Sequence, residues 1–181
     1  MSKSRGSVLL VSLVLLLIMT VAGLTAIRIS SLEETISGNY LDQQMAFQAA
    51  EAALLEAEHR IASTPVNLSG FSPDCSGGWC FSGEDINDLN ACSSDEIFWQ
   101  DKEVWDSANR HQVVTIEIEG ISARGKYIVE FLCYVAKDSH GPLPDPGNIN
   151  EWAHYFRITA LATGGTEHAR VMLQTTFKKN D

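Results

Sequence analysis

The uncharged run that decides the fold is Ser7-Val-Leu-Leu-Val-Ser-Leu-Val-Leu-Leu-Leu-Ile-Met-Thr-Val-Ala-Gly-Leu-Thr-Ala-Ile27. As a helix rising about 1.5 Å per residue, the run would span roughly 31 Å, which is the thickness of a bilayer core. Only a short basic leader, Met1-Ser-Lys-Ser-Arg-Gly6, precedes it. The sequence therefore predicts a membrane-spanning helix over residues 7–27.

The helical pattern continues beyond the apolar run. Apolar residues recur at steps of three and four, as in an amphipathic helix, at Ile29, Leu32, Ile36, Tyr40, Phe47, Ala50, Leu54, Ala57 and Ile61. Thr64-Pro65 should end the helix, because the residue before a proline is pushed out of the α region. We expect one helix over residues 7–62, apolar all round in its first half and amphipathic in its second.

Two simpler interpretations compete for this N-terminus. A cleaved signal peptide has a shorter apolar stretch with a small-x-small site on its far side, whereas here residues 23–26 run straight into helical sequence. A plain signal anchor would hold a periplasmic domain to the membrane. Gly6, between the basic leader and the apolar run, favours a third possibility, which is cleavage on the cytoplasmic face so that the apolar helix is kept.

A basic leader that ends in glycine before an uncut apolar helix resembles the N-terminus of type IV prepilins. The stretch from Leu32 to Leu54 resembles PilX-type minor pilins more narrowly, in the segments Leu-Glu-Glu, Gly-Asn and Ala-Phe-Gln-Ala-Ala-Glu-Ala-Ala-Leu. The segment from Phe156 to Phe177 resembles the same family more weakly.

The resemblance implies that prepilin peptidase cleaves between Gly6 and Ser7, and that Ser7 is then N-methylated. Most type IV pilins have Phe directly after the cut and Glu four residues later, where this chain has Ser7 and Val11. That Glu is thought to neutralise the N-terminal amine of a neighbouring subunit. Its replacement by Val11 argues for a minor subunit in a special position rather than a major one.

The charge pattern indicates topology and excludes one class of partner. A basic leader before a chain with a formal net charge of −10 places the N-terminus in the cytoplasm and a head, residues 63–181, in the periplasm. Such an acidic chain without a basic cluster in its sequence is a poor nucleic-acid binder.

Cys75, Cys80, Cys92 and Cys133 lie in the exported part, where disulfides are the default. Four cysteines allow three pairings, and we favour Cys75–Cys80 with Cys92–Cys133. A zinc site needs paired ligands at short spacing, which these positions do not offer, so we expect no metal.

The head is predicted to be α+β and type IV pilin-like. Residues 66–111 form a long connection, in which residues 95–105 are expected to hold a short helix that packs over the sheet, the alternative being a surface that contacts a partner. Alternating patterns then predict four consecutive antiparallel strands, with a hairpin loop at 120–125 and with Tyr127, Val129, Phe131, Cys133 and Val135 on one face. The second half of the long helix, through Phe47, Ala50, Leu54 and Ile61, is expected to cover the sheet.

No catalytic constellation stands out, so we expect neither enzymatic activity nor a cofactor. The five histidines are scattered, and neither a nucleophile elbow nor a phosphate-binding glycine loop occurs. Glu33 and Glu34 lie just beyond the predicted span, where a solvated or subunit-contacting pair is the ordinary explanation.

The resemblance implies a structural function: a minor pilin that primes type IV pilus assembly and lies at or near the fibre tip, supporting twitching motility and adhesion. Its partners would be other minor pilins, the major pilin, prepilin peptidase, the inner membrane before assembly, and possible tip adhesins. The alternatives are a minor pseudopilin of a type II secretion system and a signal-anchored periplasmic binding or enzymatic module.

Overall fold

The computed structural model describes residues 7–83, 85–89, 97–118, 120–166 and 168–180, without the side chains of Ser7 and Ile118. Helix α1 runs from Ser7 to Ser63, so it ends one residue later than predicted, directly before Thr64-Pro65. Two compact units divide the chain, and the second begins inside α1 at Asp42. The part of the helix from Asp42 to Ser63 therefore belongs to the same unit as the sheet.

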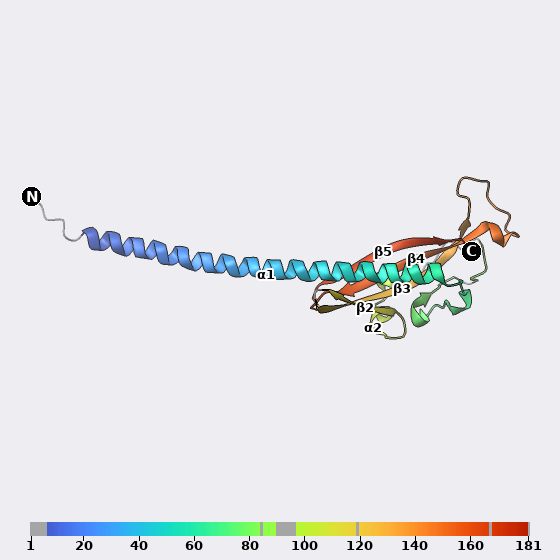
Figure 1. Ribbon diagram of the computed structural model, residues 1–181, viewed down its shortest axis with the longest axis horizontal. Helices are drawn as coiled ribbons and strands as arrows, with labels where there is room; N and C mark the ends of the chain where they lie inside the picture. The colour runs from blue at the N-terminus through green and yellow to red at the C-terminus, as the bar shows by residue number, and fades with distance from the viewer. Residues whose placement is uncertain (1–6, 84, 90–96, 119, 167, 181) are drawn as a thin grey trace, which may run out of the picture. The chain divides into compact units, whose positions relative to one another are not determined.

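The second unit is α+β (Figure 1). A short helix, α2, runs from Lys102 to Asp106, within the connection where a helix was expected. The strands are β1 (Trp79–Cys80), β2 (Gln112–Ile118), β3 (Ile121–Ala136), β4 (Trp152–Thr163) and β5 (Arg170–Lys179). Single 3-10 turns lie at Leu68–Gly70, Ser76–Gly78, Phe98–Gln100 and Ile149–Glu151.

The sheet contains the four predicted antiparallel strands and one more. β2, β3, β4 and β5 pair consecutively and antiparallel. β1 pairs in parallel with β3, placing Trp79 opposite Val129 and Cys80 opposite Glu130. The expected count of four strands is therefore wrong by one, because a two-residue strand carries no alternating pattern that could reveal it.

The hairpin between β2 and β3 is tighter than the expected loop at 120–125. Ile118 pairs with Ile121, so the strands continue almost to the turn. Gly120 has a φ of 83°, a conformation that a glycine adopts without steric strain. Gly125 is not part of the loop but lies inside β3.

A β-bulge in β3 overturns part of the predicted strand face. Phe131 pairs with Phe156 but Cys133 pairs with Tyr155, so one extra residue separates them on β3. An inserted residue reverses the alternation of side chains beyond it. Tyr134, rather than Cys133 and Val135, consequently joins the core cluster of Tyr127, Val129 and Phe131.

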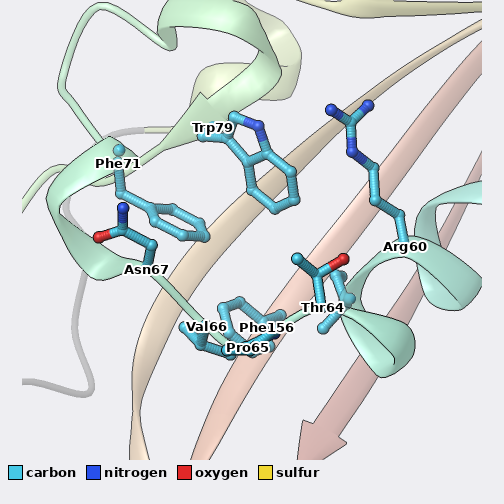
Figure 2. A pocket seen from close by; sticks show the side chains of 10 residues that line it. Arg60, Thr64, Pro65, Val66, Asn67, Phe71, Trp79 and Phe156 are labelled. Carbon is cyan, nitrogen blue, oxygen red and sulfur yellow. The ribbon is translucent and has the colours of Figure 1, made fainter.

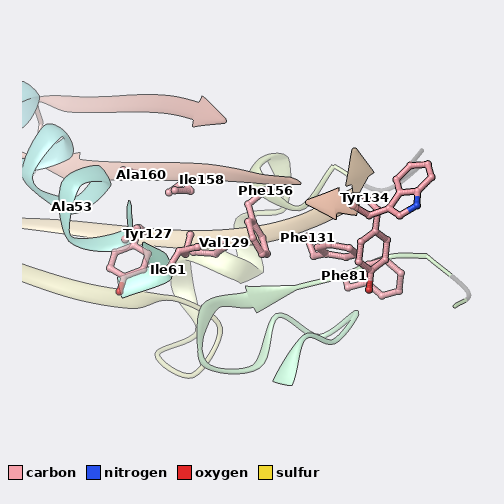
Figure 3. Packing of buried hydrophobic residues seen from close by; sticks show 12 residues of the cluster. Ala53, Ile61, Phe81, Tyr127, Val129, Phe131, Tyr134, Phe156, Ile158 and Ala160 are labelled. Atoms are coloured by element: carbon pink, nitrogen blue, oxygen red, sulfur yellow. The ribbon is translucent and has the colours of Figure 1, made fainter. Parts of the chain in front are cut away.

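The second part of α1 packs against one face of the sheet, mainly through small residues. Ala53, Ala57 and Ile61 share a buried cluster with the apolar side chains of β3 and β4 (Figure 3). A Cβ atom at Gly125 would lie 2.6 Å from the carbonyl oxygen of Ala49 and 2.8 Å from the Cβ of Ala53. The glycine on β3 and the alanines on α1 thus allow a close approach of helix and strand.

Phe47 does not cover the sheet as expected, since 40% of it is exposed. Leu54 is half-buried and packs at the edge of the core cluster. Ala50 and Ile61 are buried as predicted. The helical pattern predicted the sheet-facing side of α1 only approximately. Where α1 and β3 approach closely, small side chains fit and large ones do not, whatever their hydrophobicity.

Two parts of the connection 66–111 pack differently: Phe71, Trp79 and Phe81 join the cluster on the helix side of the sheet. Residues 98–105 cover the other face, as predicted for the short helical segment. Phe98, Val104 and Trp105 share a second buried cluster with Ile128 of β3. Beneath this cover Glu130 is only 2% exposed, and its two carboxylate oxygens each accept a 2.7 Å hydrogen bond from Arg157. This ion pair, which the sequence did not reveal, raises the pKa of Arg157.

Candidate assembly surfaces

The first part of α1, up to Leu41, presents large apolar side chains that are exposed. Every large hydrophobic side chain from Val8 to Leu41 is between 43% and 72% exposed. Val11, the position at which most type IV pilins carry Glu, is 54% exposed. By length and composition α1 is a helix able to cross a membrane. Such a surface must be buried in lipid or against neighbouring helices.

Glu33 and Glu34 are both exposed, and neither makes an ion pair with a residue that the structure describes. Gly6 lies outside the described residues, as does the side chain of Ser7. The predicted cleavage between them and the assembly roles of Val11, Glu33, Glu34, Phe47 and Leu54 stay predictions.

The side chain of Asp42 links α1 by hydrogen bonds to the turn between β4 and β5. One carboxylate oxygen accepts a 2.9 Å hydrogen bond from the backbone N–H of Thr166, and the other accepts a bond from the Thr166 hydroxyl. These bonds lower the pKa of Asp42. Gly164 in the same turn faces the Asp42 backbone so closely that a side chain there would collide with it. No local motif marks this pair, because 124 positions separate its two members.

The C-terminal end of α1 borders a pocket of about 270 Å³ (Figure 2). The guanidinium of Arg60 lies 5.7 Å from the centre of the Trp79 ring and donates a 3.2 Å hydrogen bond to Gln112. Phe71 packs edge-on against Trp79 and stacks on Phe156. The pocket is lined mostly by apolar side chains, and the guanidinium of Arg60, which lines it, already contacts Trp79 and Gln112.

Two lysine side chains of β5 donate hydrogen bonds to backbone carbonyls at the ends of α1 and β3. The ammonium of Lys179 donates a 2.7 Å hydrogen bond to the carbonyl of Ile61 in the last turn of α1. It also donates to the carbonyl of Thr64, directly after the helix. Unsatisfied carbonyls and the negative end of the helix dipole favour a cation there. Lys178 donates to the carbonyls of Ala136 and Lys137 at the end of β3.

Cys75 and Cys80 form a disulfide, the pairing we favoured for these two residues. Both are fully buried, and the bond joins the turn at Cys75 to strand β1 within the connection 66–111. Cys92 lies outside the described residues, so its pairing with Cys133 stays a prediction. Cys133 itself is buried in β3.

Among the described residues, no group of three or more His, Cys, Asp or Glu side chains could hold a metal ion. His111 is buried, and its Nδ1 lies 2.9 Å from the carbonyl oxygen of Val104. Burial lowers the pKa of His111, which fits a neutral side chain packed within the fold.

Comparison with protein families covers both units. A model described as type IV pilus assembly protein PilX, C-terminal part, matches residues 76–179, which is more than half of the chain. A second model, PilX N-terminal, matches residues 5–55 and thus most of α1. No curated protein and no solved structure matches the chain. With both family models matched in their expected order, the chain belongs to the PilX family of type IV pilus assembly proteins.

Proposed function

We propose that this minor pilin joins other minor pilins to prime pilus assembly and lies at or near the tip of the fibre. The observation that carries the proposal is the exposure of every large apolar side chain from Val8 to Leu41. Before assembly the bilayer would bury this surface, with the N-terminus in the cytoplasm and the head in the periplasm. In the fibre the same surface would pack against the helices of the major pilin and of other minor pilins.

Prepilin peptidase would remove the leader after Gly6 and leave an amine on Ser7. A Glu at the position of Val11 would attract the amine of a subunit above, and this attraction is strong only in a low-dielectric core. A subunit with no neighbour above it gains nothing from that Glu, and an apolar residue avoids placing an unpaired carboxylate in hydrocarbon. Val11 therefore supports a position at the top of the minor-pilin stack.

The test compares cells that lack the chain with cells that carry it with an epitope tag at the C-terminus. Without the chain we expect far fewer surface pili, with less twitching and less adhesion. Immunogold labelling of the tag should mark one end of each sheared pilus. Unchanged pilus numbers in the deletion strain would contradict the priming role, and gold particles along the shaft in many copies would contradict the tip position.

A further inference from the structure

A hollow of about 310 Å³ lies on the sheet face that points away from α1. Gly125 on β3 and Ala162 on β4 face the helix, so their strand neighbours Arg124 and Thr163 face the other way. Pairing places Arg124 beside Thr163, and Thr163 beside Arg170. The adjacent row on this face holds Lys126, Leu161 and Met172.

The hollow concentrates positive charge on an acidic protein. Lys102, Arg124, Lys126 and Arg170 line it together with one acid, Asp106, whereas the whole chain has a formal net charge of −10. Lys102 pairs with Asp106, and Lys126 donates to the backbone carbonyl of Trp105.

Arg124 and Arg170 are exposed and make no ion pair with any described residue. The three other arginines of this unit all have partners: Arg60 has Trp79 and Gln112, Arg110 has Asp101, and Arg157 has Glu130. A single strand separates Arg124 from Arg170, so their backbones lie about 10 Å apart. Four cations and a single acid, Asp106, line the hollow, so it keeps an excess of positive charge that attracts an anion.

We propose that this basic hollow docks an acidic segment of a neighbouring pilus subunit, an inference that rests on the proposed function. The planar guanidinium group of an arginine binds a carboxylate through two parallel N–H···O hydrogen bonds. Leu161 and Trp105 line the hollow with apolar surface, and Met172, 40% exposed, lies beside Leu161 on the next strand. A peptide carrying Asp or Glu covers such surface with its methylene groups, whereas a small inorganic anion leaves it in water.

The test uses the full chain in piliated cells, with the photo-crosslinking amino acid p-benzoylphenylalanine at Met172. A control crosslinker at Thr176 lies on the same face of β5 but outside the hollow. We expect Met172 to crosslink to a segment of another pilus subunit that carries at least one Asp or Glu. The double variant Arg124→Glu/Arg170→Glu should reduce the yield about tenfold or more. Arg124→Lys/Arg170→Lys, which keeps both charges, should retain most of it.

The reciprocal change gives the sharpest result: replacing the crosslinked Asp or Glu by Lys should restore the yield in the Arg→Glu double variant. An unchanged yield in that variant, or a crosslink only to lipid or glycan, would overturn the inference while the chain is still found in sheared pili. A chain absent from sheared pili would instead overturn the proposed function, and this inference with it. Melting curves of the double variant should match the parent, because both arginines are exposed and unpaired.

Discussion

The two parts of α1 are apolar in different ways. From Val8 to Leu41 the apolar side chains are mostly Leu, Val and Ile, and each large one is at least 43% exposed. From Asp42 onwards the buried positions are chiefly alanines, and Ala46, Ala49, Ala50, Ala53 and Ala57 are at most 1% exposed. Large side chains suit a surface that must bury itself in lipid or neighbouring subunits, while small ones suit a helix that approaches a strand closely. One continuous helix thus carries an exposed apolar surface in its first part and an interface to its own sheet in its second.

The largest expected effect follows from placing a charge in the second interface. Ala53→Asp should destabilise the head by about 3 kcal/mol or more, because it buries a carboxylate without a partner. Leu55→Asp is the matched control, since Leu55 lies two residues away on the same helix but is 66% exposed. Denaturant unfolding of the full chain in detergent, followed by tryptophan fluorescence, measures both. Equal stabilities of the two variants would show that α1 does not pack on the sheet through its alanines.

A smaller loss should come from the strand side of the same contact. Gly125→Ala places a methyl group against the Ala49 carbonyl and the Ala53 side chain, so we expect a loss of about 2 kcal/mol from overpacking. Gly70→Ala serves as the control, because nothing lies within 4 Å of an added Cβ there. Unfolding midpoints in urea compare the two variants. A stable Gly125→Ala protein would mean that the helix and β3 are not in close contact.

Asp42 lies where the two parts of α1 meet, and its removal should have a modest effect. Asp42→Asn should lower stability by about 0.5 kcal/mol, because solvent screens its bonds to Thr166. The folded pKa of Asp42 lies below its ordinary value of 3.8. Its contribution is therefore fully present above about pH 4 and is lost as the pH falls through the lower folded pKa.

Thermal melts of the parent and of Asp42→Asn across this pH range give the measurement. The difference in Tm should be constant near neutral pH and should shrink under acid conditions. Thr166→Val should remove most of the same difference. A Tm difference that grows as the pH falls would contradict the role of the Asp42 carboxylate.

In the first part of α1, Val11→Glu should have the smallest effect. If no subunit lies above this one, a carboxylate at position 11 has no amine to meet, and piliation should stay near the parent level. Counts of surface pili by electron microscopy test this expectation. Much stronger or weaker piliation would indicate a neighbour above, and therefore a position below the tip.

The sequence predicted much of this fold, because long periodic patterns reflect a single physical cause. The helix was correct to one residue at its end, and β2 to β5 were found from alternation of apolar and polar residues. β1, the bulge in β3 and the tight turn at Gly120 were missed, since each depends on pairing between strands rather than on a local pattern.

Among the functional features, the apolar surface of α1 was readable from composition alone. The contacts of Asp42 with Thr166, of Lys179 with Ile61 and of Arg157 with Glu130 were not, because residues distant in the sequence meet only in the folded chain. The wrong expectation for Phe47 had a similar origin. Hydrophobicity indicates burial, but only the distance between two backbones decides which size of side chain fits between them.

On the proposed function, the apolar first part of α1 is kept in the fibre, where it packs against other subunits. Intact-mass and N-terminal peptide spectrometry of the chain from sheared pili test this claim most directly. We predict a mature chain that begins at Ser7 and carries one N-methyl group. A chain that begins at Met1, or after residue 23, would contradict the claim and would favour a plain membrane anchor or a cleaved signal peptide.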